Sequence, residues 1–227
     1  AFALNIATNV AFSTKKKVCV FSLEMSADQL VLRMLASEAL VDSYRLRSGQ
    51  LTPEDWNKIA DAAMRLSATD ILIDDTSGMS VTAMKAKLRR VENLGLVVVD
   101  YLQLMESERP SDNRSVEVGY ISRGLKLMAK DLRAPVICCA QLSRGPESRT
   151  DKRPQLSDLR DSGSIEQDAD AVLFLYRDEY YKTDRDREGN VAEVIIQKNR
   201  HGTTGKITMG WIGSYTRFRT LDDHPEP

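Results

Sequence analysis

Histidine and cysteine are scarce in this sequence, which limits the chemistry it can perform. Only two histidines, His201 and His224, occur among 227 residues. This argues against a histidine-rich metal site and against a Ser-His-Asp triad. The three cysteines, Cys19, Cys138 and Cys139, sit in apolar runs, where cysteine usually packs as a small hydrophobic residue. Thiols of this kind are typical of a reducing compartment, so we expect a cytoplasmic protein.

Long apolar runs and an excess of one charge are absent as well. No apolar stretch approaches the length of a membrane span, and the first ten residues lack the basic flank and cleavage site of a signal peptide. We therefore expect no contact with a membrane. The net charge is −1, so any contact with nucleic acid has to come from local clusters of basic residues.

Short apolar runs alternate with helical patterns through the first 140 residues. Strands are predicted at 18–21, 71–73, 96–99 and 136–140, and helices at 1–11, 27–40, 53–66, 81–90 and 116–132. This order predicts an α/β fold with a mainly parallel central sheet and flanking helices on both faces.

Local signals mark several helix starts. Ser26 with Gln29 forms a capping box, Thr52 precedes a proline and two acids, and Ser80 is a third expected N-cap. The buried face of the helix after Thr52 is expected to hold Trp56, Ile59, Ala63 and Leu66.

The pattern changes after residue 165. Strands are predicted in close succession at 171–175, 191–197, 206–211 and 216–220, with a glycine-bearing hairpin turn at 199–205. We therefore expect the sheet to end in antiparallel C-terminal strands. No repeat or low-complexity linker interrupts the chain, so one domain at 1–221 is expected, followed by a frayed C-terminal tail at 222–227.

Polar residues follow three of the predicted parallel strands. Glu24, Asp100 and Gln141 each come just after an apolar run, and ligands of open α/β sheets bind beyond that edge. Asp100 would suit a nucleotide-bound magnesium ion, Glu24 could polarise a water, and Gln141 could bind a terminal phosphate. Each residue also has a simpler interpretation: Asp100 capping a turn, Glu24 favouring a helix N-terminus, and Gln141 facing solvent.

Two basic features lie further along the chain. The polar loop from Leu159 to Ser164 contains an arginine and a glycine that could hold a nucleic-acid phosphate, although it could equally be a surface turn. Lys198 and Arg200 are two residues apart, so both lie on one face at the end of a predicted strand that leads into a hairpin. A cationic pair projected on a turn is the geometry of an arginine finger. A solvated hairpin is the alternative.

Taken together, these segments resemble the C-terminal helicase domain of the DnaB family over nearly the whole chain. The motifs that carry the resemblance are Phe21-Ser22-Leu23-Glu24-Met25, Asp100-Tyr101-Leu102-Gln103-Leu104-Met105, Gln141-Leu142-Ser143-Arg144, Asp151-Lys152-Arg153-Pro154 and the longest, Ser157 to Asp170. The resemblance implies a RecA-like motor that uses ATP and Mg²⁺, forms a homohexamer, and moves along single-stranded DNA to unwind duplex at the replication fork.

The resemblance also implies roles for single residues. Asp100 is similar to the Walker B acid, Glu24 to the catalytic glutamate, Gln141 to the γ-phosphate sensor and Arg33 to an arginine near the nucleotide. Lys198 and Arg200 are similar to a finger pair that acts on the nucleotide of the neighbouring subunit.

For DNA binding, the resemblance implies Arg160, Asp161 and Gly163 in one loop. A second loop, 106–114, offers Arg109 and Arg114. A primase and a helicase loader are the implied protein partners.

One family motif does not occur in the sequence. Gly-x-x-x-x-Gly-Lys-Ser/Thr, the phosphate-binding loop, is absent, and we expect it directly upstream of a first helix that begins at Ala1 without a cap. Two other functions therefore stay open: a RecA-type strand-exchange ATPase, and a non-enzymatic docking scaffold without nucleotide binding.

Overall fold

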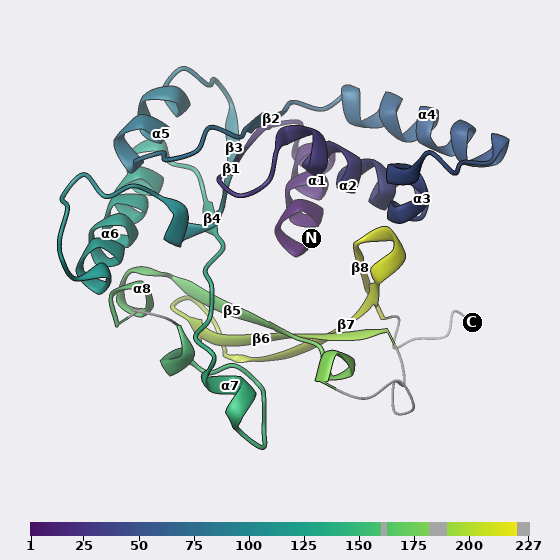
Figure 1. Cartoon of the computed structure of the whole chain (residues 1–227). Helices are drawn as coiled ribbons and strands as arrows, with labels where there is room; N and C mark the ends of the chain where they lie inside the picture. The colour runs from purple at the N-terminus through teal and green to yellow at the C-terminus, as the bar shows by residue number, and fades with distance from the viewer. Residues whose placement is uncertain (160–162, 182–189, 222–227) are drawn as a thin grey trace.

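The computed structural model describes residues 1–159, 163–181 and 190–221 (Figure 1). The predicted frayed tail, 222–227, lies outside these ranges. In the described chain the parallel part contains α1 (Phe2–Thr14), β1 (Lys17–Ser22), α2 (Ala27–Ala39), α3 (Ser43–Ser48), α4 (Pro53–Ser67), β2 (Ile71–Asp74), α5 (Val81–Leu88), β3 (Leu94–Asp100), η1 (Leu102–Leu104), α6 (Arg114–Leu132) and β4 (Val136–Cys138). The remainder contains α7 (Gly145–Ser148), η2 (Leu156–Asp158), α8 (Gly163–Asp168), β5 (Ala171–Tyr176), η3 (Asp178–Tyr181), β6 (Val191–Asn199), β7 (Gly205–Ile212), η4 (Gly213–Tyr215) and β8 (Arg217–Thr220).

The first four strands form a parallel sheet in the order β2-β1-β3-β4. Val20 of β1 pairs with Ile73 of β2 on one side and with Val98 of β3 on the other. Because all four strands run in the same direction, their carboxyl ends lie at one edge. The predicted mainly parallel sheet is therefore confirmed.

Helices cover both faces of this sheet, as Figure 1 shows with α5 and α6 on one side and α1 and α2 on the other. Side chains alternate between the faces along each strand. Val97 and Val99 pack toward α5 and α6 with Met84 and Ile121, whereas Val98 packs toward α1. Two-sided burial explains why these strands are apolar throughout.

The three predicted N-caps are present, but Ser26 and Gln29 form only one of the two hydrogen bonds of the predicted capping box. The side chain of Ser26 accepts a hydrogen bond from the Gln29 N–H, and Ser80 accepts one from the Ala83 N–H. At α4, Thr52 forms a capping box with Asp55.

The predicted buried face of α4 was half right. Ile59 packs against the cluster that contains Ala39 and Ala62, and Leu66 is partly buried, but Trp56 and Ala63 were wrongly placed inside. Trp56 is 60% exposed, and Ala63 is exposed as well. The buried positions are instead Asp55, which binds Arg45 of α3, and Ala62, which packs against α2. The capping box turns Asp55 inward, and this rotates Trp56 to the outside.

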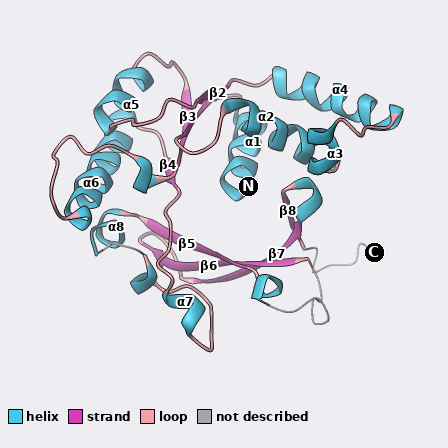
Figure 2. Cartoon of the chain, viewed as in Figure 1, coloured by secondary structure: helices cyan, strands magenta, loops and turns pink. Residues whose placement is uncertain are grey.

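The last four strands form an antiparallel sheet of their own, in the order β5-β6-β7-β8. Figure 2 shows the strands in these two groups. The expectation of antiparallel C-terminal strands is confirmed, but they do not continue the parallel ladder. The chain passes through the unpredicted short helices α7 and α8 between β4 and β5, so β5 begins away from β4.

Specific contacts join the C-terminal part to the rest of the fold. Leu142 and Leu159 form an isolated antiparallel bridge. Near β8, the backbone N–H of Phe218 donates to Asn5 Oδ1 of α1 at 2.9 Å, and the rings of Phe2 and Phe218 meet edge to face. None of the described helices has the length and apolarity needed to cross a bilayer.

Candidate functional site

The tips of β1 and β3 place Glu24 and Asp100 at the same edge. Ser22, the last residue of β1, pairs with Asp100, and the Leu23 N–H donates to the Asp100 carbonyl at 2.8 Å. Glu24 follows directly. It is exposed, and it makes no ion pair within the described residues. A carboxylate held at a strand tip without a partner is available to bind water or a ligand.

The tip of β4 brings Gln141 to this edge. The Cys139 N–H donates to the Val99 carbonyl at 2.9 Å, and the Leu102 N–H donates to the Cys139 carbonyl at 2.9 Å. These bonds join the segments that leave β3 and β4. Burial, followed by the charge of Asp100, raises the pKa of the Cys139 thiol to about 11. Cys139 therefore stays a neutral thiol beside Asp100.

Arg33 of α2 is near enough to the start of α1 to act electrostatically on its amino group. The amino group of Ala1, at the start of α1, has a lowered pKa because it is buried and because Arg33 is close, while Asp100 acts in the opposite sense. Arg33 and Asp100 therefore both lie near the start of α1. The structure thus brings Glu24, Arg33, Asp100 and Gln141 to one margin of the sheet, although their roles stay predictions.

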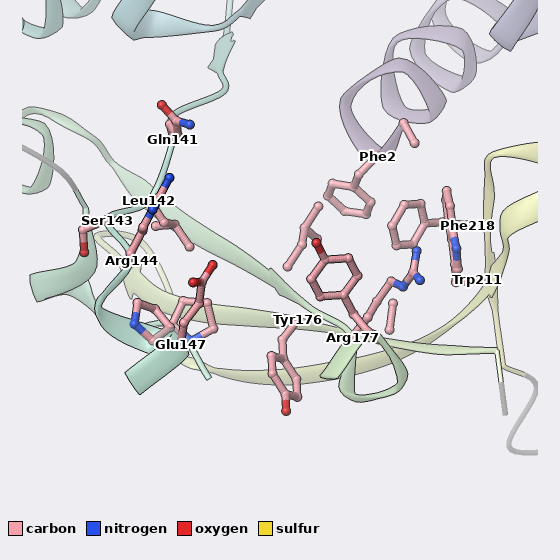
Figure 3. A pocket seen from close by; sticks show the side chains of 16 residues that line it. Phe2, Gln141, Leu142, Ser143, Arg144, Glu147, Tyr176, Arg177, Trp211 and Phe218 are labelled. Atoms are coloured by element: carbon pink, nitrogen blue, oxygen red, sulfur yellow. The ribbon is translucent and has the colours of Figure 1, made fainter. Parts of the chain in front are cut away.

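Gln141 lines a cavity of about 490 Å³ between the start of α1, the segment after β4 and the antiparallel sheet. Figure 3 shows Gln141 and Leu142 on one side of this cavity, and Phe2, Arg177, Trp211 and Phe218 on the other. The Arg177 guanidinium lies over the Trp211 ring at 5.3 Å, and Trp211 lies against Phe218 with 4.7 Å between ring centroids. One wall is therefore aromatic and cationic.

The predicted finger pair lies elsewhere, against α8. The Lys198 ammonium donates to the carbonyls of Glu166 and Gln167, and Arg200 donates to the Gln167 carbonyl. Arg200 also lies 3.7 Å from Asp170. Both cations therefore interact with the negative C-terminal end of α8. Within one subunit they do not reach the edge that carries Glu24 and Asp100.

The predicted DNA loop is only partly described. Arg160 and Asp161 lie outside the described residues, and Gly163 is the exposed first residue of α8. The base of the loop is well defined, because the Ser143 N–H donates to the Asp158 carbonyl at 2.7 Å. The segment after Gln141 is thus hydrogen-bonded to the start of the loop that was predicted to bind DNA.

A buried ion pair fixes this base. Asp158 is 4% exposed and accepts hydrogen bonds from Arg149 at 2.9 and 2.5 Å. Burial acts to raise the pKa of Asp158, but the hydrogen bonds from Arg149 and from the Gln155 N–H outweigh it, so the pKa is lowered. Sequence patterns gave no sign of Arg149, because its partner is defined only by the folded loop.

The two arginines of the second predicted DNA loop differ in their surroundings. Arg109 is exposed and lies over the Tyr120 ring at 5.4 Å. Arg114 binds Glu117 at 2.6 Å and the Gln103 carbonyl at 2.7 Å. Arg109 is therefore the freer candidate for a phosphate, while Arg114 holds the start of α6 in place.

The donor set fits a magnesium ion that arrives with its nucleotide. No group of three or more histidine, cysteine or acidic side chains able to hold a metal occurs in the described ranges. Mg²⁺ usually takes one or two carboxylates together with phosphate oxygens and water. Asp100 is placed to be such a carboxylate, either directly or through water.

A parallel sheet with acids and an amide at its carboxyl edge, joined to an antiparallel C-terminal sheet, defines an α/β ATPase domain of the RecA-like class. Comparison with known proteins narrows this class. Residues 1–220 match the model of the DnaB-like helicase C terminal domain, and the chain belongs to this family.

Sequence relatives agree with this assignment. The chain is 51% identical over 226 residues to the replicative DNA helicase DnaB of Geobacillus stearothermophilus, covering 98% of this chain and 50% of that protein. It is 50% identical over 226 residues to the replicative DNA helicase DnaC of Bacillus subtilis strain 168, with the same coverage. The chain spans about half the length of these curated relatives.

Solved structures agree as well. One solved ATPase domain superposes with a TM-score of 0.91 at 38% identity, covering 97% of this chain and 80% of that one. A DnaB-like replicative helicase, solved to show its interactions with primase, gives the same score and identity, with 55% of its chain covered.

Proposed function

We propose that this chain is the motor of an ATP-driven replicative DNA helicase that travels 5′ to 3′ on single-stranded DNA. The observation that carries the proposal is the convergence of Glu24, Asp100 and Gln141 at one sheet edge in a chain of the DnaB-like family. We also propose that residues 1–221 act as one motor domain.

The proposed roles follow from position. Glu24, exposed and without an ion-pair partner among the described residues, is suited to orient and polarise the attacking water. Asp100 would hold Mg²⁺, which neutralises charge on the phosphates when bound. Gln141 offers an uncharged amide to a terminal phosphate. Arg33 supplies a positive charge on the α2 side.

The finger pair would act between subunits of a homohexamer. Within their own subunit, Lys198 and Arg200 do not contact the sheet edge that carries Glu24 and Asp100. They bind carbonyls at the end of α8 instead. Docking of Arg200 on the nucleotide of a neighbour would release these contacts. Arg200 would then move between two positions, one on the end of its own α8 and one on the neighbour's nucleotide. Because α8 begins at Gly163, this movement would link the nucleotide state to the proposed DNA loop.

DNA would contact the loop that contains Arg160, Asp161 and Gly163, with Arg109 as an additional cation. The support is the bond from Ser143 to Asp158, which joins the base of this loop to the segment after Gln141. Arg114 contributes by holding the second loop, since its side chain is already bound to Glu117.

The proposed protein partners are a primase and a helicase loader, in the cytoplasm where a bacterial chromosome lies. One of the similar structures was solved for its interactions with primase. The partners would bind the full-length gene product.

Strand displacement on a forked DNA by the full-length gene product tests the proposal. The wild type should unwind the fork only with ATP. Glu24→Gln should still bind ATP but should turn over at least a hundredfold more slowly, because the base is lost. A wild-type protein that binds DNA without unwinding would favour the scaffold, and one that exchanges strands would favour the strand-exchange ATPase. Either result would overturn the helicase assignment.

A further inference from the structure

One polar side chain connects the sheet edge to both neighbouring segments. Gln103 lies in η1, three residues after Asp100, and is half-buried. Its Oε1 accepts the Gln141 N–H at 3.0 Å, and its Nε2 donates to the Gln141 carbonyl at 3.2 Å. The side chain thereby binds both backbone groups of Gln141, as a neighbouring β-strand would.

The backbone of the same residue binds the second loop. The Gln103 carbonyl accepts a hydrogen bond from Arg114 at 2.7 Å, and Arg114 also binds Glu117 at 2.6 Å. Glu117 in turn accepts the Ser111 N–H at 3.2 Å. A continuous set of hydrogen bonds therefore runs from the backbone of Gln141 to the loop at 106–114.

Only an amide of this length can make both side-chain bonds. An amide presents one donor and one acceptor side by side. A glutamate would keep the acceptor for the Gln141 N–H but would set a carboxylate oxygen against the Gln141 carbonyl. An asparagine would be one methylene too short, and an alanine would make neither bond.

We propose that Gln103 is a positioning residue that fixes the backbone of Gln141 and transmits its movement to the 106–114 loop. The inference rests on the proposed function, in which Gln141 responds to the terminal phosphate. In this arrangement Gln103 touches neither nucleotide nor DNA. Its loss should therefore reduce the coupling between the two ligands more than the binding of either one.

Affinity for single-stranded DNA, measured with a non-hydrolysable ATP analogue and again with ADP, gives a direct test. The full-length gene product carrying Gln103→Ala should bind the analogue within about twofold of wild type. Two lost hydrogen bonds of about 1 kcal/mol each should reduce the ratio of the two DNA affinities by up to about thirtyfold. Gln103→Glu should lose at least as much. Gln50→Ala, at an exposed position after α3, is the matched control and should keep the wild-type ratio.

The outcomes separate this inference from the proposed function. A wild type with equal DNA affinity in both nucleotide states and no DNA-stimulated ATPase contradicts the proposed function itself. If the wild type binds DNA differently in the two nucleotide states and the Gln103 variants keep the same ratio of affinities, only the positioning role is overturned. DNA affinity reduced equally in both states would also overturn it, because that pattern indicates a merely structural residue. If Gln103→Ala does not fold, the isosteric Gln103→Glu decides.

Discussion

At the scale of single residues, several polar side chains hold two or more groups at once. Asp158 binds Arg149 and the backbone of Gln155, and Gln103 binds both backbone groups of Gln141. Such buried or half-buried groups are costly when one partner is removed, because the remaining group stays desolvated. Their removal should therefore have specific effects.

Arg149→Met should destabilise the protein by roughly 2–3 kcal/mol at pH 7, because it leaves the buried Asp158 carboxylate without its cation. The pKa of Asp158 is lowered in the folded protein, so the ion pair stabilises fully above the unfolded value of about 4. Its contribution is lost as the pH falls through the lower folded value. Urea unfolding of both proteins at pH 7 and pH 3 measures this. If the free energies of unfolding of wild type and Arg149→Met differed by the same amount at both pH values, the ion pair between Arg149 and Asp158 would not be the cause.

Arg200→Ala should reduce ATP turnover by about a thousandfold or more, since a finger stabilises charge that develops on the transferred phosphoryl group. Binding of single-stranded DNA should persist, because Arg200 binds the C-terminal end of α8, whereas the proposed DNA loop leads into the start of that helix. Steady-state ATPase and fluorescence anisotropy of labelled DNA measure the two effects. Normal ATP turnover in this variant would show that Arg200 does not act as an arginine finger.

Residue patterns predicted the polar residues at the strand tips, but not the side chains that hold the neighbouring segments in place. An apolar run that ends in Glu24, Asp100 or Gln141 is visible in sequence, because parallel strands share one edge. Gln103 and Arg149 carry no such signal. Their partners, Gln141 and Asp158, come close only when β3, β4 and η2 are packed, so sequence spacing alone could not identify them.

At the scale of elements, helix starts were predictable and helix faces were less so. Ser26, Thr52 and Ser80 act locally, through the N–H groups of the first turn. The face of α4 depends on α2 and α3, and Trp56 was wrongly placed inside. The helices α3, α7 and α8 have six residues or fewer, which is too short for a helical period to show.

Thr52→Ala should lower the free energy of unfolding by about 1 kcal/mol, because the Asp55 N–H loses its acceptor. The Thr52 hydroxyl bond to Asp55 is lost as well. Chemical denaturation measures the change. Asn57→Ala, at an exposed position inside α4, is the control and should be neutral or slightly stabilising. If the two variants were equally stable, the capping box would contribute nothing.

At the scale of the whole molecule, the residues proposed for ATP hydrolysis lie on two separate sheets. The parallel sheet carries the acids and the amide, whereas the antiparallel sheet carries Lys198 and Arg200 near the end of β6. The separation of the two sheets was not predicted, because the connection through α7 and α8 has no strong periodicity. In an assembly, this division would place one subunit's cations against its neighbour's strand tips.

The most direct test of this arrangement mixes two inactive forms of the full-length gene product. Glu24→Gln subunits retain Arg200, and Arg200→Ala subunits retain Glu24. In mixed rings, an interface with Glu24 from one subunit and Arg200 from the other contains both groups. DNA-stimulated ATPase of the mixture should therefore exceed the sum of the two separate activities, whereas a mixture that only equals this sum would contradict a site shared between subunits.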